Sequence, residues 1–203
     1  MKIITYLMAT LPKKNNFEDF VKIFLPNDFL EKEVLKALDY FKKITLKKNE
    51  FLVNENEICT HFCFVENGIL QHAINIEGEE RTTYLALKNT VTSSLNSFLH
   101  KVPSRKSIKA IVDSSLWVIH LEDFNYLLQH NKAFHQFYFH LIEKQICLID
   151  DYRIDLLTLT PEERYKKLLV NEPKLLQEVP LHYLASFLGI STRHMSRIRK
   201  NIL

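Results

Sequence analysis

The stretch between residues 40 and 121 constrains the fold most, because short strand-like runs alternate there with turn signals. Asn67-Gly68 separates FCFV from ILQHAI, and Glu77-Gly78 separates ILQHAINI from RTTYLAL. Asn-Gly between such runs is a strong hairpin signal. The last two runs, SIKAIVD and LWVIHL, are expected to join at the serine pair 114–115. Short strands of even spacing predict an antiparallel β-roll or barrel.

Helical periodicity brackets this stretch on both sides. Residues 17–38 repeat apolar side chains at helical spacing. Further on, residues 122–129 are expected to form a short helix and residues 132–157 a long one. The long helix carries two apolar stripes that both step by three and four residues. One stripe is Phe134, Tyr138, Leu141, Leu148 and Tyr152, and the other is Phe139, Ile142, Ile146, Ile149 and Leu156.

A helix that is apolar on two sides has to bury both of them. One stripe can cover the β-roll. The other predicts a homodimer, in which the same helix of a second subunit packs against it. The alternative is a long helix that is buried on both sides within one subunit.

The segment TPEE at residues 160–163 predicts the start of a new helix. Thr160 can cap a helix, Pro161 suits the first helical position, and Glu163 completes a capping box. We therefore place a domain boundary near residues 158–160. The predicted domains are a sensor at 1–130, a dimerisation helix at 131–158 and a C-terminal domain at 159–203.

The C-terminal domain contains one of only three glycines in the chain. Residues 180–188 read as a helix, Gly189 can supply the positive φ of a tight turn, and Ser191 can cap a second helix. A helix, a short glycine turn and a second helix form the helix-turn-helix unit.

The second helix of this unit is amphipathic and basic. Residues 180–203 contain four Lys or Arg and no Asp or Glu, although the whole chain has a net charge of only +3. On a helical wheel Met195 and Ile198 face one side, and polar or cationic residues face the other. Arginine can bond guanine edges and lysine can neutralise phosphates. The candidate DNA-binding residues are Ser191, Thr192, Arg193, His194, Ser196, Arg197, Arg199 and Lys200. The alternative is a basic surface helix with no nucleic-acid role.

No enzyme or metal site is expected. The sequence shows no nucleophile–base set and no phosphate-binding glycine loop. Cys59, His61 and Cys63 are expected on one strand, where the two cysteines would lie about 13 Å apart, too far for one zinc ion. With 46% hydrophobic and 25% charged residues and no apolar run of membrane-spanning length, the composition is typical of a soluble globular protein. The N-terminal MKIITYLMATLPKK lacks a clear small-residue cleavage site, so no signal peptide is expected. An odd count of three cysteines favours reduced thiols, so a cytoplasmic location is expected.

The order of parts resembles the Crp/Fnr family of bacterial transcription regulators, in the branch common in Bacteroidetes. The resemblance runs from about residue 17 to the end. Its most specific segments are TPEERYKKLL at 160–169 and VPLHYLASFLGISTRHMSRIRK at 179–200. It implies an α+β fold with a cyclic-nucleotide-binding-like jelly roll, a dimer through the long helix, and a recognition helix for each of two DNA half-sites. Thr192, Arg193 and Arg197 match the family's base-reading positions.

Two departures from the family pattern affect what is recognised. Many members have Arg-Glu where this chain has Thr192-Arg193, so the acid that could accept from cytosine is missing. Cyclic-nucleotide-binding members carry Gly-Glu-Leu and, later, Arg-Ser; here Ser93-Ser94-Leu95 takes the first place. No carboxylate lies between Glu80 and Asp113. We therefore expect a degenerate effector pocket that does not bind cyclic AMP. Its candidate residues are Thr92, Ser93, Ser94, Arg105 and Lys106.

The sequence thus predicts a dimeric, non-enzymatic DNA-binding transcription regulator without a cofactor. Three scattered cysteines do not supply an iron–sulfur cluster. The expected partners are double-stranded DNA, a second copy of the chain, RNA polymerase and an unidentified small effector, and no membrane. The alternative is a ligand- or protein-binding module whose helix-turn-helix is vestigial.

Overall fold

The computed structural model describes residues 17–23 and 31–202, apart from the side chains of residues 31 and 202. The remaining residues, 1–16, 24–30 and 203, lie outside this description. The stretch considered for a signal peptide and the start of the predicted sensor domain are among them. Within the described residues, no helix combines the length and the apolar character that crossing a membrane requires.

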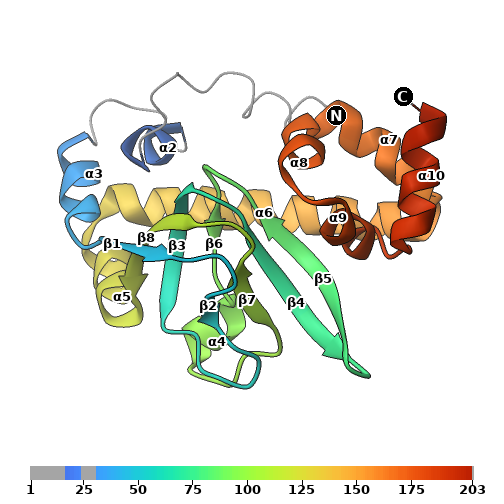
Figure 1. Cartoon of the computed structure of the whole chain (residues 1–203). Helices are drawn as coiled ribbons and strands as arrows, with labels where there is room; N and C mark the ends of the chain where they lie inside the picture. Colours follow the sequence, from blue (N-terminus) through green and yellow to red (C-terminus); the bar gives the residue numbers. More distant parts are fainter. Residues whose placement is uncertain (1–16, 24–30, 203) are drawn as a thin grey trace.

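Two four-stranded antiparallel sheets form the β-roll (Figure 1). The first has the order β1-β8-β3-β6 and the second β2-β7-β4-β5. The strands are β1 (Lys42–Leu46), β2 (Phe51–Val53), β3 (His61–Asn67), β4 (Leu70–Ile76), β5 (Glu79–Ala86), β6 (Val91–Thr92), β7 (Ser107–Ala110) and β8 (Ser114–His120). The predicted antiparallel roll within an α+β fold is confirmed.

The two glycine turns of the roll do different things. Glu77 and Gly78 both have positive φ and close a two-residue hairpin, because β4 and β5 pair from Ile76↔Glu79 onward. The expected hairpin at Asn67-Gly68 is wrong, since β3 and β4 belong to different sheets. This turn carries the chain from one sheet to the other, and its glycine lies against Ser114 of β8.

Two predicted strand limits also shift. The serine pair 114–115 belongs to β8, and the turn before it lies at residues 111–113. Asp113 fixes that turn by accepting from the backbone N–H of Lys48 at 2.9 Å. Strand β3 begins at His61 and not at Ile58, which forms only an isolated bridge with Pro103.

Helices cover the roll and extend away from it. The elements are α2 (Phe17–Ile23), α3 (Glu31–Leu38), α4 (Leu95–His100), α5 (Leu121–His130) and α6 (Lys132–Thr158). Phe17 of α2 stacks on Phe64 of β3, with ring centroids 4.6 Å apart. The predicted helices at 122–129 and 132–157 are confirmed within one or two residues, whereas α4 is not evident from sequence periodicity.

The C-terminal part is entirely helical. Its helices are α7 (Pro161–Asn171), α8 (Pro173–Glu178), α9 (Leu181–Phe187) and α10 (Thr192–Ile202). The capping box at Thr160 forms as expected: its side chain accepts from the N–H of Glu163, and the Glu163 carboxylate accepts from the N–H of Thr160. In Figure 1, α6 runs behind the sheets and links the roll to this helical part.

Gly68→Ala is expected to destabilise the protein strongly. An added Cβ would lie 2.1 Å from Ser114 Oγ and 2.7 Å from its Cα, at a φ of +101°. A backbone clash together with positive φ should lower the free energy of unfolding by about 2–4 kcal/mol. Gly78→Ala is the matched control: its φ is +87°, but no atom lies within 4 Å, so about 1 kcal/mol is expected. Urea unfolding measures both, and equal losses would contradict the role of Ser114.

Candidate nucleic-acid interface and effector site

The turn between α9 and α10 is a Schellman motif. The N–H of Ile190 donates to the carbonyl of Ala185 at 3.0 Å, and the N–H of Gly189 donates to that of Ser186 at 3.1 Å. Gly189 has a φ of +71°, as the sequence predicts. Ser191 then caps α10, since its hydroxyl accepts from the N–H of His194 at 3.2 Å.

Helix α10 is buried on one face only. Met195 and Ile198 are buried against α9 and belong to the second hydrophobic cluster of the protein. The opposite face consists of polar and cationic residues. The exposed members of the predicted set are Ser191, Thr192, Arg193, Ser196, Arg197 and Lys200, while Arg199 is partly buried. The wheel therefore describes the helix correctly.

His194 differs from the other predicted contact residues because its ring binds within the chain. Its Nε2 lies 3.0 Å from Oε1 of Glu162 in α7. The pKa of the Glu162 carboxyl is lowered, first by a hydrogen bond from its own backbone N–H, then by His194, with a smaller effect of Arg197. Glu162 thus gives the basic helix an acidic neighbour on α7.

The helix-turn-helix is docked against β5, the edge strand of the second sheet. Ser186 of α9 accepts through Oγ from the backbone N–H of Thr82 in β5, at 2.9 Å. Tyr152 of α6 stacks on Phe187, with ring centroids 5.5 Å apart, and its hydroxyl donates to the Phe187 carbonyl. Arg164 donates to the carbonyl of Leu188 at 2.9 Å. Sequence reasoning missed these contacts, because nothing in the local pattern marks their residues.

The two stripes of α6 have different environments. The stripe of Phe134 and Leu141 is buried against the roll, and its later members are partly buried. The stripe of Phe139 remains open: Phe139 is 59%, Ile146 62% and Ile149 64% exposed. A groove of about 460 Å³ between α5 and α6 opens beside it and includes Phe139 and Ile142 in its lining.

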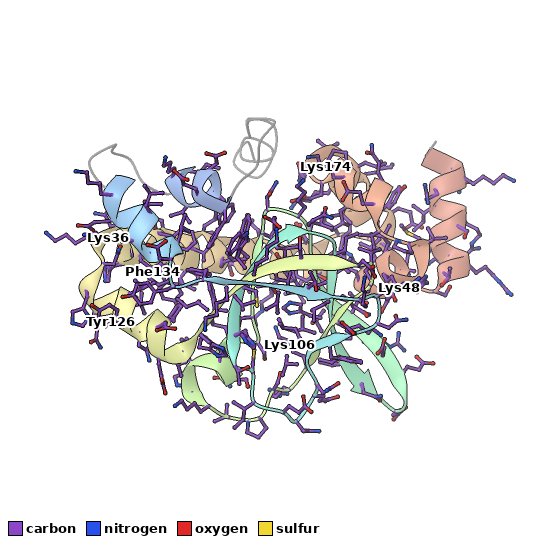
Figure 2. The ribbon with its side chains drawn as sticks, turned by 60° about the vertical axis from the view of Figure 1, so that its left-hand side comes forward. Lys36, Lys48, Lys106, Tyr126, Phe134 and Lys174 are labelled. Carbon is purple, nitrogen blue, oxygen red and sulfur yellow. The ribbon has the colours of Figure 1, made fainter. Side chains whose placement is uncertain are left out.

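The predicted effector residues are only partly available to a ligand. Ser94 Oγ is 2.7 Å from Ser104 Oγ, and Ser93 Oγ donates to the carbonyl of His61. Arg105 is exposed on the surface, whereas Lys106 is partly buried. Figure 2 shows Lys106 among the strands of the roll. Of the two candidate cations for the effector pocket, Arg105 and Lys106, the geometry favours Lys106.

Thr92 contacts a buried histidine that the sequence analysis did not select as a site residue. Its hydroxyl lies 2.5 Å from Nε2 of His72, a buried histidine of β4. Burial, with a smaller effect of Lys106, lowers the pKa of His72 well below its usual range. The ring meets Tyr84 edge-on, and burial raises the pKa of Tyr84 to about 12. His72 and Thr92 come together only because the two sheets pack face to face.

Within the described chain, no group of three or more His, Cys, Asp or Glu side chains converges around the CTHFC segment. Cys59 and Cys63 are both buried free thiols. Cys59 lies ahead of β3, and its Sγ is 3.6 Å from Ser93 Oγ. Burial raises the pKa of the Cys63 thiol, which keeps it protonated.

His72 is expected to make the protein less stable as the pH falls below about 6.5, its ordinary pKa. Below that value the unfolded chain takes up a proton that the buried ring refuses. This residue should therefore lower the free energy of unfolding by up to about 1.4 kcal/mol per pH unit. Urea unfolding at several pH values between 7 and 5 should show a smaller slope for His72→Gln. The exposed His100→Gln variant is the control, and identical slopes in both variants would contradict the assignment.

Comparison with known proteins agrees with this geometry. Residues 43–131 match the sequence model of the cyclic nucleotide-binding domain. No curated protein matches the chain significantly. The chain thus contains a cyclic nucleotide-binding domain, followed by the helical part described above.

Solved regulators share the architecture over most of the chain. The catabolite activator protein of Thermus thermophilus is 21% identical, with a TM-score of 0.55 over 88% of this chain and 86% of its own. FixK2 of Bradyrhizobium japonicum is 14% identical, with a TM-score of 0.68 over 80% and 84%. A CooA mutant of Carboxydothermus hydrogenoformans is 15% identical, with a TM-score of 0.66 over 94% and 85%. The chain has the fold of the Crp/Fnr transcription regulators.

Proposed function

We propose that this protein is a dimeric, DNA-binding transcription regulator of the Crp/Fnr type that acts in the cytoplasm. The observation that carries the proposal is the exposed cationic face of α10, which Met195 and Ile198 hold outward. A recognition helix needs one packed face and one face of donors that can enter the major groove. RNA polymerase is the further partner that such a regulator would contact.

The alternative function is a ligand- or protein-binding module whose helix-turn-helix is vestigial. The Schellman turn and the Ser191 cap favour the regulator, because both features keep the geometry of the motif intact. Binding to DNA that weakens steeply with salt separates the two functions, since only a cationic DNA-binding face releases counterions.

The proposed dimer forms through the open stripe of α6. Phe139, Ile142, Ile146 and Ile149 lie on successive turns, and the groove beside Phe139 can receive side chains of the partner. Two copies joined along α6 would present two α10 helices to two half-sites, as helix-turn-helix dimers do.

We further propose that the effector pocket is degenerate and does not take cyclic AMP. Ser93 and Ser94 stand where the family carries its Gly-Glu pair, and both hydroxyls already bond within the chain. The part of the roll between residues 81 and 112 offers no carboxylate to a ribose hydroxyl.

Arg197→Ala is expected to weaken binding to the preferred DNA site by about 1–3 kcal/mol and to relax one base preference per half-site. Lys200→Ala should instead weaken specific and scrambled DNA alike and lower the salt slope by about one per site. The two side chains are both exposed, one helical turn apart. Titrations of each variant against both duplexes at several salt concentrations distinguish base readout from phosphate contact. If Arg197→Ala lost the same affinity on both duplexes, base readout by Arg197 would be wrong.

The double variant Ile146→Asp, Ile149→Asp is expected to be monomeric at micromolar concentration. Carboxylates placed in an apolar interface lose their hydration, so the dimer should dissociate at least about tenfold more readily. Sedimentation velocity measures this. Asp151→Ala, an exposed α6 position outside the stripe, is the control and should remain dimeric. A wild-type monomer, with or without DNA, would overturn the two-half-site arrangement.

A further inference from the structure

Only the two residues Leu159 and Thr160 join α6 to α7, and both have extended backbone angles. A short extended connector limits the distance between two helices, but it leaves the angle between them to side-chain contacts. In the proposed dimer, this angle decides where each α10 lies relative to the α10 of the other subunit. Contacts that cross the connector therefore control how the two α10 helices meet DNA.

Arg164 of α7 contacts the ends of two helices at once. Its Nη1 donates to the carbonyl of Leu159 at 3.0 Å, and its Nη2 donates to the carbonyl of Leu188 at 2.9 Å. Leu159 is the C-cap residue of α6, and Leu188 is the C-cap residue of α9. One guanidinium group thus bridges the C-terminal ends of α6 and α9, and we call this contact the Arg164 bridge. The Lys167–Asp155 ion pair also crosses the connector, but it joins α6 only to α7.

The carbonyls at the end of α9 are shared between the turn and side chains of α6 and α7. The backbone bonds of the turn occupy the carbonyls of residues 184–186. The next carbonyl, that of Phe187, accepts from the Tyr152 hydroxyl of α6 at 3.3 Å, and the two aromatic rings stack. The carbonyl after it, that of Leu188, accepts from Arg164. The end of α9 is therefore tied to α6 directly through Tyr152 and again through the Arg164 bridge.

The chemistry of the bridge requires a guanidinium group. Helix C-termini carry partial negative charge, so a cation that touches two of them is stabilised by both. Arg164 is partly buried, and among the described residues no carboxylate forms an ion pair with it. Its Nε is buried without a hydrogen-bond partner, so the carbonyls are what hold the side chain. The planar fork of an arginine reaches two carbonyls in a fixed geometry, which the single ammonium group of a lysine does not.

We infer that Arg164, supported by Tyr152, is a positioning residue that fixes the angle between α6 and the helix-turn-helix and so sets the half-site spacing that the protein accepts. It acts through the end of α9 and not by contact with a base. One base pair more or less between the half-sites turns one of them by roughly 35° about the DNA axis. A fixed angle therefore discriminates between spacings, and a loose angle does not. This inference rests on the proposed regulator and names what determines its choice of DNA geometry.

The first test compares DNA duplexes that differ in half-site spacing. The preferred duplex is selected from random DNA with the full-length wild type. Further duplexes place the half-sites one base pair closer or farther apart, and one duplex contains a single half-site. The wild type is expected to prefer its own spacing at least about tenfold. In Arg164→Met this preference should fall to within about twofold, while the affinity for the single half-site stays unchanged.

Further variants separate the bridge from charge and from overall stability. Arg164→Lys keeps the charge but holds only one carbonyl, so its spacing preference should be smaller than that of the wild type. Tyr152→Phe retains the ring stack and should lose a smaller part of the preference. Lys166→Met removes an exposed cation from the same helix and should keep the wild-type preference. A wild-type preference in either Arg164 variant, or a wild type without any preference, would overturn the inference. So would an equal loss of affinity on the single half-site, which a general loss of structure produces.

A distance measurement without DNA keeps the positioning role separate from the proposed regulator. One spin label is placed on Cys147, an exposed cysteine of α6, and a second on Asn201→Cys, near the exposed end of α10; Cys59 and Cys63 are buried and do not take the label. With labelled chains diluted in unlabelled ones, electron–electron resonance should give one narrow distance distribution for the wild type and a broader one for Arg164→Met.

The two measurements have different consequences. An unchanged width of the distance distribution would overturn the positioning role, whether or not the protein binds DNA. A broadened distribution in a protein that shows no salt-dependent DNA binding would refute the proposed regulator and leave the Arg164 bridge standing. If Arg164→Met does not fold in urea-unfolding controls, Arg164→Lys carries both measurements, with the same direction expected for each.

Discussion

The contact between α9 and the edge strand β5 decides where the rest of the helical part lies. Because β5 is the last strand of its sheet, its outward N–H groups have no strand partner, and Ser186 accepts from one of them. Leu85 on β5 and Met195 on α10 belong to one hydrophobic cluster that crosses from roll to helices. The position of α9 on β5 therefore sets the direction in which the cationic face of α10 points. Figure 1 shows α9 beside β5.

In contrast to α9, which packs against β5, the long helix α6 leaves one apolar face exposed. Burying a side chain such as Ile146 or Phe139 contributes about 1.5–3 kcal/mol. An open row of these side chains therefore favours association of two copies more than any polar contact on the same helix. The Lys167–Asp155 ion pair joins α6 to α7 and thereby links the proposed dimer axis to the helix-turn-helix.

The interior of the roll combines a dense aromatic core with a few polar groups that are not fully satisfied. Around Phe62, Phe98 and Phe124 the packing is tight and apolar. The Nδ1 of His72, in contrast, is buried without a hydrogen-bond partner. Regions with unmet polar groups are those in which a ligand can add the most, because binding removes a penalty that the empty fold carries.

The sequence alone determined the features that depend on neighbours within a few residues: the strand and helix periods, the capping box at Thr160, the turn at Gly189 and the amphipathic α10. Local backbone preferences and side-chain spacing are sufficient for these. The tertiary structure alone decided that the chain changes sheets at Gly68 and that the His72 ring bonds the Thr92 hydroxyl across the roll. It also decided that the Ser186 hydroxyl accepts from the N–H of Thr82, 104 residues away in the sequence. Such pairings follow from the closing of two sheets and the docking of a helix on an edge, and no local pattern encodes which distant surfaces will meet.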